Sequence, residues 1–196
     1  PASSGMQVAT TTDRLWDLRR GLTELYVSEH PLDCLTCTAN GDCELQDVAS
    51  EVGLREVRYD NTPSCEGMPI DESNPFFSFD PSKCIVCSRC IRACDDIQAT
   101  HALSIDGRGF FSRIIAGADE LFMDSDCVSC GACVNECPVA ALEDTVERKH
   151  GKPDTYVRTT CAFCGVGCQF DAGVKGGKLV SMIPVAESPV NQGHSC

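Results

Sequence analysis

Sixteen cysteines, placed at short and repeated intervals, constrain this 196-residue chain more than any other feature. Cysteine at this level is typical of disulfide-linked secreted domains and of proteins that bind metals. Many of these cysteines stand only two residues apart, and such close neighbours pair with each other only through strained disulfide geometry. The spacing therefore favours ligation of metal ions or clusters over disulfides.

The strongest pattern is a run, Cys-x2-Cys-x2-Cys-x3-Cys, that occurs twice at a period of 43 residues, the second time followed by Pro138. A cubane cluster has four iron corners, and two-residue spacing lets consecutive thiolates reach adjacent corners. The run resembles that of bacterial ferredoxins with two 4Fe–4S clusters, in which the fourth cysteine of each run ligates the other cluster. This resemblance implies two ligand sets, namely Cys84, Cys87, Cys90 and Cys137, and Cys127, Cys130, Cys133 and Cys94.

A second pattern combines one histidine with three cysteines, as His30-x3-Cys34-x2-Cys37-x5-Cys43. A lone histidine after a helix is usually a surface residue, but the three cysteines that follow favour a ligand. The segment resembles the His/Cys3 cluster segment shared by the large subunits of respiratory NADH dehydrogenases, iron-only hydrogenases and NAD-linked formate dehydrogenases. An imidazole in place of a thiolate makes a cluster less negative, so we expect a raised reduction potential there.

A third pattern places three cysteines close together and a fourth at the end, as Cys161-x2-Cys164-x3-Cys168 and Cys196. It is similar to the N-terminal cluster site of molybdenum or tungsten bis-pterin oxidoreductases, and the ending Gly193-His194-Ser195-Cys196 looks like the formate dehydrogenase branch. Glycine adopts backbone conformations that other residues avoid. We therefore expect the intervening Gly165 and Gly167 to form the tight turns needed beside a cofactor.

In this order, the three patterns resemble the N-terminal region of the catalytic subunit of a cytoplasmic NAD-dependent formate dehydrogenase. The resemblance implies four 4Fe–4S clusters that relay electrons from formate oxidation to NAD+, and no catalytic residue in this chain. It also implies an upstream 2Fe–2S domain, a downstream domain with a molybdenum or tungsten bis-pterin, and partner subunits with FMN and NAD. The ends at Pro1 and Cys196 predict a piece of a longer protein.

Three alternatives remain open. The large subunit of an NADH-quinone oxidoreductase shares the first and last patterns, but that family keeps one cluster in its ferredoxin-like unit, whereas Cys94 and Cys130 complete both sets here. The second alternative is a hydrogenase: an iron-only hydrogenase shares the first two patterns but should continue into a different cysteine pattern, and an NAD-linked hydrogenase would have a corresponding cluster-bearing large subunit. The non-redox alternative is a structural zinc or disulfide module, although zinc sites usually gather two pairs of ligands. Cys65 matches no pattern and is predicted to be a passive thiol.

The charge and hydropathy of the chain exclude two classes of partner. A formal net charge of −13 argues against nucleic acid, because phosphate binding needs clustered Lys and Arg. The sequence also contains no apolar run long enough to span a bilayer.

The fold class predicted from these patterns is α+β, built of small cluster-stapled modules. Residues 1–60 form the His/Cys3 segment, with one amphipathic helix over 12–29 and a second over 45–52. In the first helix, Leu15, Leu18, Leu22 and Leu25 form the apolar face, and Glu24 is expected to point away from it.

The remaining modules follow in order along the chain. Residues 61–79 are a linker or belt, 80–142 a ferredoxin-like domain with strands at 102–105 and 110–115, and 143–155 a second linker. Residues 156–196 form a β-rich cluster domain with strands at 156–160, 170–175 and 179–183.

Overall fold

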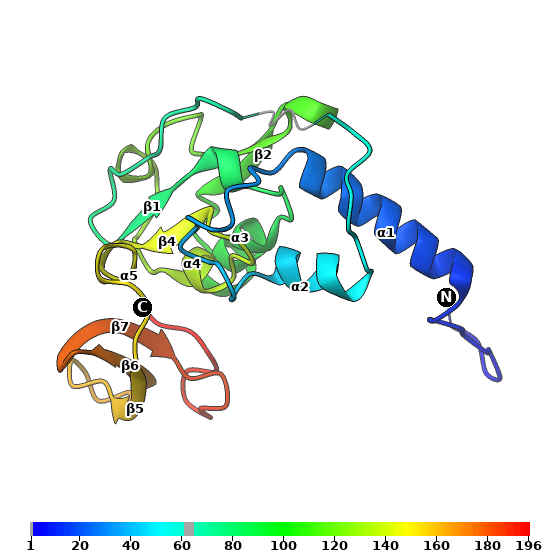
Figure 1. The fold of residues 1–196 in the computed structure, drawn as a ribbon. Coiled ribbons are helices and arrows are strands. Elements are labelled where there is room, and N and C mark those ends of the chain that lie inside the picture. The colour runs from blue at the N-terminus through cyan, green and yellow to red at the C-terminus, as the bar shows by residue number, and fades with distance from the viewer. Residues whose placement is uncertain (1, 61–64) are drawn as a thin grey trace.

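The computed structural model describes residues 2–60 and 65–196. Pro1 and the linker residues 61–64 lie outside the described residues. Figure 1 shows two helices on one side of a mixed middle unit and a three-stranded sheet beneath that unit. The elements are α1 Asp13–Ser28, α2 Glu44–Glu51, β1 Phe77–Phe79, α3 Arg89–Arg92, β2 Leu103–Asp106, β3 Arg113–Ala116, α4 Ala132–Asn135, β4 Leu142–Asp144, α5 Thr145–His150, β5 Thr155–Thr160, β6 Gln169–Lys175 and β7 Lys178–Pro184.

Helices α1 and α2 confirm the two predicted helices of the first module. The Thr12 hydroxyl caps α1 by accepting a hydrogen bond from the Leu15 N–H at 3.3 Å. Helix α2 begins directly after Cys43, which occupies its N-cap position. The Glu44 N–H donates to the Pro138 carbonyl at 3.0 Å, and this bond ties the start of α2 to the middle unit.

The predicted orientation of α1 is wrong. Leu18, Leu22 and Leu25 are about half exposed, whereas Glu24 is only 2% exposed. The reason is the returning chain: Arg58 donates to both carboxylate oxygens of Glu24, at 2.6 to 3.0 Å, and holds the pKa of that carboxyl below its usual range. A paired charge, rather than the leucines, occupies the inner face of the helix.

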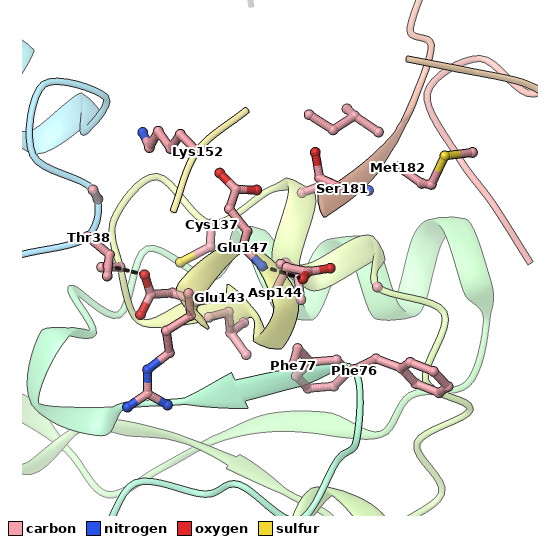
Figure 2. A pocket seen from close by; sticks show the side chains of 18 of the residues that line it. Thr38, Phe76, Phe77, Cys137, Glu143, Asp144, Glu147, Lys152, Ser181 and Met182 are labelled. Atoms are coloured by element: carbon pink, nitrogen blue, oxygen red, sulfur yellow. Dashed lines mark hydrogen bonds between the residues drawn. The ribbon is translucent and has the colours of Figure 1, made fainter. Parts of the chain in front are cut away.

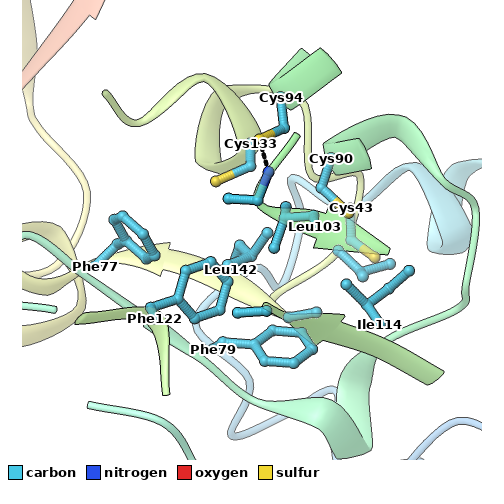
Figure 3. Packing of buried hydrophobic residues seen from close by; sticks show 14 residues of the cluster. Cys43, Phe77, Phe79, Cys90, Cys94, Leu103, Ile114, Phe122, Cys133 and Leu142 are labelled. Carbon is cyan, nitrogen blue, oxygen red and sulfur yellow. Dashed lines mark hydrogen bonds between the residues drawn. The ribbon is translucent and has the colours of Figure 1, made fainter. Parts of the chain in front are cut away.

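The middle unit is built from two related halves around one core. Antiparallel pairing joins β1 to β4, with Phe79 opposite Leu142, and joins β2 to β3, with Leu103 opposite Ala116. The Phe122 ring packs edge-on against Phe77 and Phe79, with centroids 5.1 and 5.8 Å apart (Figure 3). Phe79 and Phe122 are separated by the same 43 residues as the two cysteine runs, as are the starts of α3 and α4.

The structure differs from the sequence prediction at both ends of this unit. Strand β1 lies within the predicted linker 61–79, and both β4 and α5 extend into the predicted linker 143–155. Pairing of β1 with β4 satisfies the backbone groups of both strands, which lie more than 60 residues apart. Asp144 then caps α5 by accepting hydrogen bonds from the N–H groups of Val146 and Glu147. The middle unit is thus closed by its own flanking segments.

The three strands predicted in the last module are present as one antiparallel sheet, in the order β5-β6-β7. Gly176 and Gly177 have φ of +54° and +78°, and they form the turn between β6 and β7. Such left-handed angles favour glycine, which lacks a Cβ. Arg158 on β5 and Asp171 on β6 form an ion pair across the sheet at 2.7 Å.

We expect Phe122→Ala to destabilise the middle unit, because it empties the space between Phe77 and Phe79 in the core. Removal of a buried phenylalanine side chain typically costs about 3–5 kcal/mol, which corresponds to a fall in Tm of about 10 °C for a chain of this size. Circular dichroism of anaerobically prepared protein measures this Tm. Phe111→Ala is the control, because Phe111 is 77% exposed. Equal shifts in the two variants would contradict this description of the core.

Candidate cluster-binding sites

Cys84, Cys87, Cys90 and Cys137 come together on one side of the middle unit. Burial raises the pKa of the Cys84 thiol to about 12, and the charges of Cys90, Cys137 and Cys87 add to that effect. Burial likewise raises the pKa of Cys90 to about 12, with further contributions from Cys87 and Cys137. These four thiols are therefore electrostatic neighbours, although Cys137 lies about 50 residues beyond the other three.

Cys94, Cys127, Cys130 and Cys133 form a second group. Burial raises the pKa of Cys133 well above its usual value, and the charges of Cys90, Cys130, Cys127 and Cys94 raise it further. Figure 3 shows Cys133 beside Cys94, which reaches this group from the first cysteine run. Because Cys90 of the first group also acts on Cys133, the two groups adjoin.

The loops that carry these thiols repeat one unusual backbone conformation. Val86 and Ser88 have φ of +50° and +64°, and the equivalent residues Ser129 and Gly131 have φ of +56° and +75°. The N–H groups of Val86 and Ser129 each donate to the sulfur two residues earlier, Cys84 and Cys127 respectively, at 3.4 Å. A left-handed conformation is strained for a β-branched residue such as Val86. It also turns successive N–H groups toward one side of the loop, where they stabilise anions.

The fourth cysteine of the first run is held by a local hydrogen-bond network. Cys94 lies in a π-helix, Ala93–Gln98, a conformation that is frequent at functional sites. Its sulfur accepts a hydrogen bond from the Ala102 N–H at 3.3 Å and lies 3.3 Å from the Thr100 hydroxyl. These contacts direct the Cys94 sulfur toward the second group.

His30 and Cys43 are buried, whereas Cys34 and Cys37 are half-buried between them. Burial has the largest effect on the pKa of His30 and lowers it. The negative charges of Asp33 and Asp80 oppose this effect, and the positive charge of Lys83 adds to it. A lowered pKa favours neutral imidazole, which is the form that binds metals. His30 and Cys84 line one pocket of about 260 Å³, so this segment adjoins the first thiol group.

The last module brings two of its cysteines together directly. The Cys161 N–H donates to the Cys168 carbonyl at 2.8 Å, at the open end of β5 and β6. Cys164 and Cys196 are exposed. Gly167 has φ of +85°, as its predicted turn requires, whereas Gly165 does not adopt a left-handed conformation.

Sequence reasoning missed Asn191, which holds the segment before Cys196 in place. Its side-chain oxygen accepts from the Gln169 N–H at 2.9 Å, and its side-chain nitrogen donates to the carbonyls of Gln169 and His194. These bonds bring the end of the chain back to the strand that follows Cys168. An asparagine in a loop gives no distinctive sequence signal.

A cleft of about 480 Å³ separates the middle unit from the last module. Figure 2 shows Ser181 and Met182 of β7 on one side of this cleft and Cys137, Glu143 and Glu147 on the other. Across it, the Ser195 hydroxyl donates to the Cys130 carbonyl at 3.4 Å. The end of the chain therefore adjoins the second thiol group.

The donor chemistry of these groups suits iron–sulfur clusters. A thiol with a pKa of about 12 stays protonated at neutral pH, so several adjacent buried thiols bind as thiolates only if a strongly positive core compensates their charge. Within residues 2–60 and 65–196, no three His, Cys, Asp or Glu side chains are arranged to hold a single metal ion. Over the same residues, no helix is long and apolar enough to cross a membrane.

Comparison with protein families assigns three segments of the chain. Residues 19–58 match the NADH-ubiquinone oxidoreductase-G iron-sulfur binding region, residues 83–141 match the 4Fe-4S dicluster domain, and residues 154–196 match the molybdopterin oxidoreductase Fe4S4 domain. The first match includes the His30 segment, the second both thiol groups of the middle unit, and the third the cysteines of the last module.

Individual relatives agree with these assignments. One NADH-quinone oxidoreductase subunit of Rhizobium meliloti is 30% identical over 100% of this chain and 23% of its own length. A Staphylococcus haemolyticus protein named "Putative formate dehydrogenase" is 28% identical over 97% of this chain and 23% of its own length. A chain in the crystal structure of the NAD+-reducing NiFe hydrogenase in its H2-reduced state superimposes with a TM-score of 0.66 and 33% identity, over 74% of this chain and 61% of that one.

These relatives are oxidoreductases or their subunits, and the chain spans only 21% to 23% of the length of such curated relatives. The chain thus consists largely of three segments that match iron–sulfur regions, that of NADH-ubiquinone oxidoreductase-G at its start, a 4Fe-4S dicluster domain in the middle and the Fe4S4 domain of molybdopterin oxidoreductases at its end.

Proposed function

We propose that the chain relays electrons through four 4Fe–4S clusters. The electrons would come from a molybdenum or tungsten bis-pterin site, where formate is oxidised, and would pass to flavin and NAD+ on partner subunits. The net reaction converts formate and NAD+ to CO2 and NADH, and no residue of this chain contacts formate. The observation that carries the proposal is that the His30 segment, the two thiol groups and the end of the last module adjoin one another in series.

Three contacts define this series. His30 shares a pocket with Cys84. The charge of Cys90, in the first thiol group, raises the pKa of Cys133 in the second. Ser195, next to Cys196, donates to the carbonyl of Cys130 in the second group. Electrons that enter at the last module would therefore pass the second group, then the first group, and finally the His30 segment.

The residues of the chain would bind the clusters and set their potentials. The ligands in this proposal are the sixteen predicted ones, from His30 to Cys196, in the four sets given above. A 4Fe–4S cluster held by these ligands would supply one-electron transfer, at a potential that depends on ligands, burial and hydrogen bonds to sulfur. The N–H groups of Val86, Ser129 and Ala102 would donate such hydrogen bonds, and the apolar core around Phe122 would exclude water.

Two observations support formate as the substrate of the whole protein. The last segment matches a molybdopterin oxidoreductase domain, and a relative named as a formate dehydrogenase aligns with nearly the whole chain. The proposed assembly also includes an upstream 2Fe–2S domain, a downstream pterin domain and an FMN-containing NAD subunit. By the same family resemblance, we assign the assembly to the cytoplasm.

The second candidate is the cluster-bearing subunit of an NADH-quinone oxidoreductase, which the Rhizobium meliloti relative favours. The two candidates differ in their reaction with formate. Formate reduces the clusters of a formate dehydrogenase, whereas only NADH reduces those of the second candidate.

We expect Cys137→Ala to remove one cluster, because Cys137 is the distant member of the group formed with Cys84. About four irons and four sulfides should be lost per chain, together with one electron paramagnetic resonance signal. Iron and sulfide assays on anaerobic protein provide the measurement. Cys65→Ala is the matched control and should keep the full content; equal losses in both variants would argue against this ligand set.

A second experiment tests the direction of electron flow in the whole complex. With Cys161→Ala, formate should no longer reduce the clusters of the first and second thiol groups, because the proposed entry site is broken. NADH should still reduce them from the other end. Electron paramagnetic resonance after each addition gives the readout. If formate fails to reduce any cluster in the unmodified complex, the formate proposal is wrong and the second candidate is favoured.

A further inference from the structure

Lys83 lies between two of the cysteine groups and is unusually buried for a lysine. Its side chain is only 15% exposed. Its ammonium nitrogen lies 3.7 Å from the Cys37 sulfur and 3.8 Å from a carboxylate oxygen of Asp33. The next residue in the chain is Cys84, so one side chain connects the His30 segment with the first thiol group.

The backbone fixes Lys83 in this position. Lys83 ends a short 3-10 helix, Pro81–Lys83, that Asp80 caps by accepting hydrogen bonds from the N–H and hydroxyl of Ser82 at 3.0 and 2.6 Å. The Asp80 N–H in turn donates to the Ala141 carbonyl at 2.8 Å. The start of the Lys83 side chain is therefore held by the middle unit, while its tip reaches the His30 segment.

We propose that Lys83 is a tuning residue, whose fixed positive charge beside the Cys37 sulfur raises the reduction potential of the cluster bound by His30, Cys34, Cys37 and Cys43. This inference rests on the proposed function, because it requires a cluster in that segment. Reduction adds one electron to the cluster, breaks no bond and leaves the ammonium group unchanged. A nearby positive charge stabilises the reduced, more negative form.

The surroundings of Lys83 fit a role beyond that of a surface ion pair. Asp33 is 44% exposed and lies at the outer limit of ion-pair distance, and such pairs contribute little to stability. The Lys83 ammonium lies as close to the sulfur of Cys37, a predicted ligand of the same cluster, as it does to the Asp33 carboxylate.

The test is a potentiometric titration of the whole complex, followed by electron paramagnetic resonance. The relevant signal is the one that Cys34→Ala abolishes. We expect Lys83→Met to lower the equilibrium constant for reduction of the cluster that gives this signal about tenfold. For one electron this corresponds to a fall of about 59 mV in the midpoint potential. Lys83→Arg retains the charge and should restore the original midpoint.

Two further variants make the test specific. Lys178→Met removes the same charge from the exposed first residue of β7 and should leave the midpoint unchanged. Lys83→Gln removes the charge but keeps a polar side chain and should lower the midpoint in the same direction, so it decides the question if Lys83→Met loses the cluster.

An intact signal with an unchanged midpoint in Lys83→Met overturns the inference and leaves the proposed function standing. If Lys83→Met loses the cluster, an unchanged midpoint in Lys83→Gln overturns the inference in the same way. Absence of the His30 signal from the unmodified complex overturns both.

Discussion

The convergence of buried thiols from distant parts of the chain is the constraint on which the rest of the structure depends. Cys43, Cys90, Cys94 and Cys133 belong to the same buried cluster of residues as Phe77, Phe79 and Phe122. Their burial raises the pKa values of Cys90 and Cys133, so they are poor thiolates without a compensating positive charge. We infer that cluster binding supplies this charge and that it contributes folding free energy in the way that structural metals do.

The internal repeat explains how a short chain builds two such sites. Both halves carry the same left-handed loop, at Val86 and at Ser129, and each half gives its last cysteine to the other. This exchange joins the halves, and pairing of β1 with β4 closes the unit on itself. The His30 segment then adjoins the first thiol group at the pocket of His30 and Cys84, and the end of the last module adjoins the second through Ser195. The proposed relay follows this series.

Local patterns made much of this fold predictable from the sequence. The two helices at the start of the chain and the three strands of the last module are properties of short segments, and the structure ends them locally, with a cap at Thr12 and a turn at Gly176 and Gly177. The grouping of Cys137 with Cys84 followed from a family resemblance, since no spacing argument alone links residues so far apart.

The features that were mispredicted or missed depend on contacts between distant residues. Glu24 is buried because Arg58 returns to it, and Phe77 is in a strand because Asp144 lies opposite. Lys83 gains its position from a 3-10 helix anchored at Ala141. None of these contacts leaves a periodic signal in the sequence.

The central claim is that the cysteine groups hold iron–sulfur clusters, and metal and sulfide analysis of anaerobically purified protein tests it most directly. The account predicts iron and acid-labile sulfide in equal amounts, at about 16 of each for the four groups of this chain. Zinc in place of iron, with no sulfide, would contradict the account and identify the chain as a structural zinc module.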